Sequence, residues 1–265
     1  MCRNVYKQSL WEGGDEMKKT FLECDKARLT VMVQADTPER IKELIDKSTP
    51  LGAEAFGIQV ERLKPEYQNS EIYNEIFSYT DKPVYVTNYR SWYNEGKSDE
   101  VLAEELLNIA DYRPMLCDVV GDWFDKQPDE LAVNPDAIKK QKKLIDDLHK
   151  KGAEVLMSTH IFKHTKAERV LEIAVEHQKR GADISKIVVG AETMDEQLEN
   201  LKIINLLKEN LKIPFLFLSS GECSILRRIG GEIGSCMYLC VYEHDEFATP
   251  QQPLLKNIKQ IRDNM

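Results

Sequence analysis

Residues 154–189 read EVLMSTHIFKHTKAERVLEIAVEHQKRGADISKIVV, and their pattern indicates the class of fold. Two short apolar runs, at 154–158 and 186–189, have the composition of strands, and residues 165–180 between them carry apolar side chains at helical spacing. A strand, a helix and a second strand in this order predict two parallel strands joined by a crossover helix.

The same alternation continues in both directions along the chain. Strands are predicted at residues 29–33, 55–60, 83–87, 115–120, 154–158, 186–189, 214–218 and 235–241. Helices are predicted at residues 38–48, 70–79, 99–109, 135–151, 165–180 and 193–209, with a short piece at 221–230 and a last helix at 251–263. Eight strands, each followed by a helix and apolar on both faces, favour a closed (β/α)8 TIM barrel, with a doubly wound open sheet as the alternative.

The length fits one barrel and little else. The chain has 265 residues, and a (β/α)8 barrel takes about 250. No Pro/Ser-rich linker divides the sequence. We therefore expect a single α/β domain over residues 29–265, preceded by an N-terminal extension over residues 1–28 whose suggested role is to cover a barrel end.

Charge and composition exclude several classes of partner. Lys and Arg number 36 against 45 Asp and Glu, which gives a net charge of −9 and argues against nucleic acid as a partner. The one basic cluster, KKQKKLIDDLHKK at 139–151, has apolar residues at helical spacing and is interpreted as the solvated face of an outer helix.

Neither a signal peptide nor an apolar run of about 18 residues is present, so no membrane association is expected. Six cysteines without a CxxC pair fit buried thiols in a reducing, cytoplasmic setting.

Polar residues at the ends of the predicted strands form the list of candidate site residues. In a (β/α)8 barrel the chemistry lies at the C-terminal ends of the strands. The residues there are Gln59, Arg90, Asp118, His160, Lys186, Ser219 and Ser220. His160 follows the fifth strand and Lys186 lies in the sixth, so the two are predicted to be neighbours.

Lys186 stands among isoleucines and valines and has two interpretations. Its side chain either reaches water from the beginning of the strand or points into the barrel lumen. An unprotonated lysine amine inside the lumen would attack a carbonyl carbon and form a Schiff base. Such chemistry needs a group that moves protons near neutral pH, and the imidazole of His160 is suited to that role.

His160 and His164 are spaced like a metal-binding pair, but the context argues against one. A pair at i and i+4 binds metal when both residues lie on one helical turn with a third ligand nearby. Here the first histidine belongs to a strand end. We expect His160 to act as a base, His164 to be a bystander, and the site to hold no metal and no cofactor.

Three segments resemble one enzyme family. EVLMSTHIF at 154–162, GADISKIVV at 181–189 and LSSGECSILRRIGGEIGS at 218–235 are similar to the type I 3-dehydroquinate dehydratases, which are Schiff-base lyases on a (β/α)8 barrel. The resemblance runs with gaps over residues 25–260. It implies a lyase of the shikimate pathway of aromatic amino acid biosynthesis, which dehydrates 3-dehydroquinate to 3-dehydroshikimate. The implied partners are a small keto acid substrate and, as in many family members, a second copy of the chain.

The resemblance also implies roles for individual residues. Lys186 would form the Schiff base, and His160 would remove a proton and later protonate the departing hydroxyl. Glu95 would orient the histidine, although its spacing and that of Arg90 are off by one residue from the family pattern. The implied substrate-binding residues are Arg228 for the carboxylate, with its neighbour Arg227 as the alternative, and Arg90, Gln252, Gln59 and Ser220.

Strand two departs from the family pattern. Where the family has a substrate-binding Glu and Arg, this chain has Gly57 and Gln59, and only an acidic residue at the strand end persists, as Glu61. Losing an arginine that holds a buried carboxylate costs about 2–5 kcal/mol of binding. Two alternatives therefore stay open beside the dehydroquinase: a paralogue that applies the same Lys/His chemistry to another hydroxy-ketone, and a barrel that binds a metabolite without catalysis.

Overall fold

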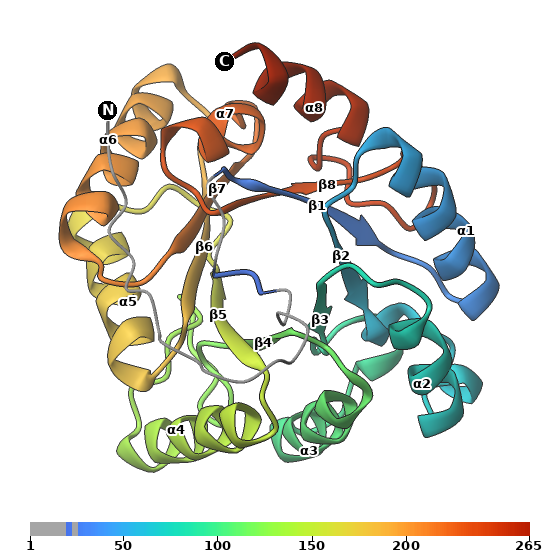
Figure 1. Ribbon diagram of the computed structural model, residues 1–265. Coiled ribbons are helices and arrows are strands. Elements are labelled where there is room, and N and C mark those ends of the chain that lie inside the picture. The colour runs from blue at the N-terminus through green and yellow to red at the C-terminus, as the bar shows by residue number, and fades with distance from the viewer. Residues whose placement is uncertain (1–19, 23–25) are drawn as a thin grey trace, which may run out of the picture.

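A ring of parallel strands surrounded by helices forms the molecule (Figure 1). The computed structural model describes residues 20–22 and 26–265. The strands are β1 (Arg28–Val33), β2 (Ala55–Gln59), β3 (Val84–Thr87), β4 (Leu116–Val120), β5 (Glu154–His160), β6 (Ile184–Gly190), β7 (Phe215–Ser220) and β8 (Met237–Cys240). The helices are α1 (Pro38–Ser48), α2 (Ser70–Ser78), α3 (Asp99–Ile109), α4 (Pro135–Lys150), α5 (Ala167–Arg180), α6 (Met194–Asn210), α7 (Leu226–Ile233) and α8 (Leu255–Asn264).

The strand order confirms the predicted barrel. Hydrogen-bonded neighbours run β7-β6-β5-β4-β3-β2-β1-β8, and each pair is parallel. Pairing of the first strand with the last, with Arg28 beside Met237, rules out the doubly wound alternative. Between β7 and β8 the backbone N–H of Cys236 donates to Phe215 O at 2.9 Å, and this bond joins the two ends of the sheet.

Most element boundaries agree with the sequence prediction, and α7 is the main exception. It begins at Leu226, five residues later than the predicted 221, and ends at Ile233. Gly221 has a φ of +88°, a left-handed conformation that a helix does not contain, so the chain turns there and continues irregularly before the helix starts. This shift changes which residues of the segment face the barrel.

Alternation along the strands sorts side chains into a lumen and an outer layer. Inside, Leu156, Ile184, Leu216 and Val188 belong to one buried cluster. Outside, Ile187 and Val189 pack with residues of α5 and α6 in another. Because successive strand residues point to opposite faces, Lys186 falls on the lumen side between Ile184 and Val188.

Phe21 lies in the lumen cluster, 2% exposed. Its backbone N–H donates to Glu154 Oε2 at 2.9 Å, at the beginning of β5. Most of the predicted extension over residues 1–28 lies outside the described residues, so its suggested role remains a prediction. In the described part of the chain, no helix has the length and apolar character needed to span a membrane.

Candidate active site

Lys186 points into the lumen and is 4% exposed. Its Nζ donates to the hydroxyl of Tyr89 at 2.7 Å and to that of Tyr85 at 3.1 Å, and it lies 3.2 Å from Asp118 Oδ2. The interpretation of a lysine that reaches water is therefore wrong. The surroundings are also more polar than the apolar neighbours in sequence indicate, because strands β3 and β4 bring two phenols and a carboxylate to the amine.

Asp118 is the buried counter-ion of this cluster. It has no exposed surface, and its carboxylate accepts hydrogen bonds from Ser158 Oγ at 2.5 Å and from the hydroxyls of Tyr89 and Tyr85. Burial by itself raises the pKa of this carboxyl, but the charge of Lys186, with contributions from His160 and the hydrogen bonds of Ser158 and Tyr85, lowers the pKa overall. The carboxylate is thus kept ionised inside the barrel. Burial, reinforced by Asp118, raises the pKa of both phenols well above the ordinary range.

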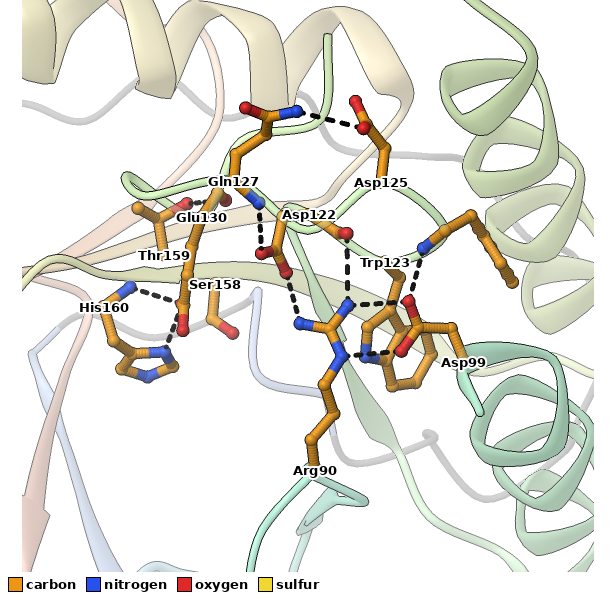
Figure 2. A network of polar contacts seen from close by, with 12 residues as sticks. Arg90, Asp99, Asp122, Trp123, Asp125, Gln127, Glu130, Ser158, Thr159 and His160 are labelled. Atoms are coloured by element: carbon orange, nitrogen blue, oxygen red, sulfur yellow. Dashed lines mark hydrogen bonds and ion pairs between the residues drawn. The ribbon is translucent and has the colours of Figure 1, made fainter. Parts of the chain in front are cut away.

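His160 lies at the end of β5, next to this cluster. Its ring meets the ring of Tyr89 edge-on at 5.5 Å between centroids and stacks on Phe162 at 5.9 Å. Glu130 Oε2 accepts from the backbone N–H of His160 at 2.7 Å and lies 2.9 Å from Nδ1 (Figure 2). With Nδ1 bound to a carboxylate, Nε2 is the nitrogen left for proton transfer.

Glu130, not Glu95, is the carboxylate that contacts the histidine. Glu95 lies exposed just after the 3-10 turn Trp92–Asn94, and no interaction of it with His160 is found. Glu130 comes from the loop between β4 and α4 and has a φ of +46°, a conformation that a glutamate adopts only when surrounding contacts impose it. Sequence reasoning missed it because this loop has no periodicity and the family pattern places the glutamate after strand three.

Arg90 does not line the lumen as a free cation. Its guanidinium binds both oxygens of Asp99, at 2.6 and 2.7 Å, and Asp122 Oδ1 at 2.6 Å (Figure 2). These carboxylates occupy the positions that a substrate carboxylate would take. Arg90 thus joins Asp99 at the start of α3 to Asp122 in the loop that carries Glu130, and its guanidinium is already paired with two carboxylates.

The buried arginine of α7 is Arg227, whereas Arg228 is exposed. Arg227 Nε donates to Ser219 O at 2.7 Å, at the C-terminal end of β7. Within residues 20–22 and 26–265, no carboxylate pairs with this guanidinium. Burial, with the neighbouring charge of Arg228, lowers the pKa of Arg227 to about 10, so it remains a cation at neutral pH. A buried cation without a carboxylate partner among the described residues is suited to hold an anionic ligand.

The remaining predicted substrate residues also lie at this end of the barrel. Gln59 accepts from Gln34 Nε2 at 2.6 Å, and Gln34 also contacts Thr249 in the loop after β8. In that loop Gln252 is buried, with its side-chain Oε1 unpaired among the described residues. Ser220 Oγ donates to Val189 O at 3.2 Å. His164 is turned toward Glu199, 3.2 Å away, and no group of three metal-binding side chains is found among the described residues.

Comparisons with known proteins place these residues in a family. The sequence model of type I 3-dehydroquinase matches residues 29–265. The chain belongs to the type I 3-dehydroquinase family. A 3-dehydroquinate dehydratase of Alkaliphilus oremlandii is 36% identical over 92 residues, which cover 34% of this chain and 36% of that protein. One of Lactiplantibacillus plantarum is 26% identical over 148 residues, covering 54% and 57%. The chain thus matches these relatives over only part of their length.

Solved structures of this family share the fold. The 3-dehydroquinate dehydratase of Geobacillus kaustophilus aligns with a TM-score of 0.78 at 14% identity, over 93% of this chain and 95% of the other. The type I enzyme of Clostridium difficile, solved with covalently modified comenic acid, aligns with a TM-score of 0.73 at 18% identity, over 90% and 92%. These likenesses concern the barrel and not the details of the site.

In strand β2 of this type I 3-dehydroquinase family member, Gly57 stands where the family pattern has a glutamate, and its neighbours leave no room for a side chain. A Cβ added to Gly57 would lie 2.3 Å from Met32 Sδ and 3.0 Å from Tyr85 Cδ1. The space that a longer side chain would need is therefore closed by two large neighbours. Glu61, the acidic residue that matches the family's acidic position at the end of this strand, is buried. It accepts a hydrogen bond from Thr87 Oγ1, and burial raises its pKa to about 7.

Proposed function

We propose that this protein is a dehydratase that converts 3-dehydroquinate to 3-dehydroshikimate through a Schiff base on Lys186. The observation that carries the proposal is a buried lysine amine in the lumen of a type I 3-dehydroquinase barrel, with His160 at the end of the adjacent strand. A barrel that only binds a metabolite has no need of a buried amine held by a carboxylate, which is costly to bury.

The proposed reaction gives Lys186, His160 and Glu130 separate roles. The amine of Lys186 adds to the ring ketone and loses water to give an iminium, which withdraws electrons and acidifies the adjacent carbon. Nε2 of His160 removes the proton from that carbon and then protonates the hydroxyl that leaves, while Glu130 holds Nδ1 and stabilises the imidazolium. Water finally hydrolyses the iminium and releases the product.

Arg227 is proposed to bind the substrate carboxylate in place of the expected Arg228. Its guanidinium is buried and has no carboxylate partner among the described residues, whereas that of Arg90 is already occupied by two. A charge-assisted pair with a carboxylate would satisfy it. Gln59, Gln252 and Ser220 are proposed to contact hydroxyl groups at the same end of the barrel.

The test is an absorbance assay with 3-dehydroquinate that follows the conjugated enone of the product. Borohydride reduction during turnover should leave an adduct on the peptide that contains Lys186, detected by mass analysis. Lys186→Ala should lose both signals, while Lys166→Ala, the same change at an exposed lysine at the start of α5, should keep them. An adduct with another hydroxy-ketone but none with 3-dehydroquinate would reject this substrate, and no adduct with any ketone would reject the Schiff base.

A further inference from the structure

Tyr89 bridges the groups of the site. Its hydroxyl accepts from Lys186 Nζ at 2.7 Å and donates to Asp118 Oδ2 at 2.5 Å, while its ring lies edge-on to His160. The direct distance from Nζ to the same carboxylate oxygen is longer, 3.2 Å. Each of the two hydrogen bonds through the phenol is therefore shorter than the direct bond from the amine to the carboxylate.

The ion pair creates a difficulty for the proposed Schiff base. An amine attacks a carbonyl only through its lone pair, but Asp118 stabilises the protonated, unreactive form of the lysine. Conversion of an ammonium and a ketone to an iminium and water moves two hydrogens from nitrogen to the departing oxygen. The overall charge stays +1, so no external acid or base is consumed, but each hydrogen needs a carrier next to Nζ.

We propose that the Tyr89 hydroxyl is the proton carrier for Schiff-base formation at Lys186, with Asp118 as the temporary acceptor and counter-ion. This proposal rests on the proposed function. In the first step a proton passes from Nζ to the Tyr89 oxygen while the Tyr89 proton passes to Asp118, which frees the lone pair. The amine then adds to the carbonyl carbon, and a second nitrogen proton moves to the carbonyl oxygen through the same hydroxyl.

Loss of water completes the step. The proton held by Asp118 returns through Tyr89 to the hydroxyl of the adduct, the carbon–oxygen bond breaks, and water leaves. The iminium that remains carries the positive charge that the ammonium carried before, so the Asp118 carboxylate again has a cationic partner when the step ends. His160 takes no part in this step and stays available for the proton on carbon.

Geometry favours Tyr89 over the other candidates. Tyr85 touches the same two groups, but its hydroxyl is 3.1 Å from Nζ and its side chain has no exposed surface. Tyr89 is half-buried and lies in the loop just after β3, at the mouth of the lumen. It is also one of two residues that separate Thr87 from Arg90, where the family pattern has one. The extra residue places a phenol at the amine and turns the arginine away.

The experiment compares the rate of imine formation with the rate of turnover. The first arm measures borohydride trapping of 3-dehydroquinate on the unaltered chain, which must succeed for the proposed function to stand. Tyr89→Phe keeps the ring and removes the hydroxyl, so its trapping rate should fall by about 10²-fold or more, the contribution expected of a general acid–base group. His160→Ala should trap at nearly the parent rate and fail only in turnover. Tyr93→Phe is the matched control, an exposed tyrosine in the same loop.

Two results would overturn the proposal while leaving the Schiff base intact. One is a Tyr89→Phe variant that traps substrate as fast as the parent. The other is a His160→Ala variant whose trapping rate falls as far as that of Tyr89→Phe, which would make the histidine the carrier. If Tyr89→Phe does not fold, Asp118→Asn, which removes the acceptor and keeps its shape, provides the same comparison. Loss of trapping in this variant supports the relay, and parent-like trapping rejects it.

Discussion

Glu130 holds His160 at two points, through the backbone N–H at 2.7 Å and through Nδ1 at 2.9 Å. Glu130 lies in a loop and His160 at the end of β5, thirty positions apart, so their contact depends on the path of the chain between β4 and α4. Thr159 Oγ1 donates to the carbonyl of Glu130 at 3.0 Å, and Arg180 binds the carbonyl of Ala132 at 2.7 Å. The loop is thus tied to the barrel at the glutamate and two residues beyond it.

Glu130→Gln should slow turnover without preventing imine formation. The amide keeps the shape of the side chain but removes the charge that stabilises the imidazolium, so we expect kcat to fall by about 10²-fold with little change in KM. Asp129→Asn is the control, because that neighbour binds Arg169 on the surface and not the histidine. Steady-state kinetics together with borohydride trapping checks this, and parent-like kcat in Glu130→Gln would show that the contact is not used.

Arg90→Lys should act on kcat rather than on KM. A lysine cannot bridge Asp99 and Asp122 in the way the planar guanidinium does, so the loop that carries Glu130 becomes less ordered and the histidine is held less well. A substrate-binding arginine would behave in the opposite way, with a raised KM. Measuring both constants over a range of 3-dehydroquinate concentrations therefore separates the two roles.

Arg227→Gln and Arg228→Gln should differ sharply. Removing a buried guanidinium that holds a substrate carboxylate costs about 2–5 kcal/mol, which lowers kcat/KM by about 30- to 5,000-fold. Arg228 is exposed and, among the residues that the structure describes, its side chain hydrogen-bonds Ser224 Oγ alone, at 3.5 Å, so its substitution should change kcat/KM less than twofold. Equal losses of kcat/KM in the two variants would contradict the proposal that Arg227, and not Arg228, binds the substrate carboxylate.

Gly57→Ala should destabilise the barrel because Met32 and Tyr85 occupy the space around it. We expect a loss of about 1–3 kcal/mol in the free energy of unfolding, measured by urea denaturation. Met32→Ala should make room for the new methyl group, so the double variant should lose less than the sum of the two single losses. Leu148→Ala, in α4, is the control partner, for which the losses should add. If the losses of Gly57→Ala and Met32→Ala add, the contact with Met32 is not what opposes the new methyl group, and the backbone shifts to accommodate it.

The barrel and its two central residues could be predicted from the sequence because they depend on local patterns. Apolar runs at strand spacing fixed the order of the strands, and the places of Lys186 and His160 on neighbouring strands followed from that order. Asp118 was found in the same way, as a polar residue in a strand. These features require no knowledge of how loops fold.

The contacts around the two central residues could not be predicted, because they depend on loops and helix phase. Glu130 reaches the histidine only through the tertiary path of an irregular loop. Arg227 and Arg228 are neighbours whose side chains point about 100° apart around a helix. Because α7 was predicted to begin at residue 221 and begins at Leu226, the sequence did not show which of the two faces the barrel. One extra residue between Thr87 and Arg90 brings Tyr89 to Lys186 and turns Arg90 toward Asp99 and Asp122.

His177 should make the stability of the protein depend on pH. It is fully buried behind β5 and β6, where its ring contacts Thr159 Oγ1 at 3.1 Å and Ser185 Oγ at 3.0 Å. Burial, with the charge of Arg180, lowers its pKa to about 3, against about 6.5 in an unfolded chain. Between these two values the unfolded state binds the proton and the folded state does not. This contribution to stability is therefore complete above pH 6.5 and is lost as the pH falls toward 3.

Urea denaturation at pH 7 and pH 5 tests this dependence. His177 should account for a decrease of about 2 kcal/mol in the free energy of unfolding between these pH values, and His177→Gln should abolish that part of the decrease whatever its stability at pH 7. Glu61, whose pKa is raised by burial to about 7, has the opposite effect in this range but is present in both proteins, so it cancels in the comparison. An unchanged dependence in His177→Gln would mean that burial does not lower the pKa of this ring in the folded state.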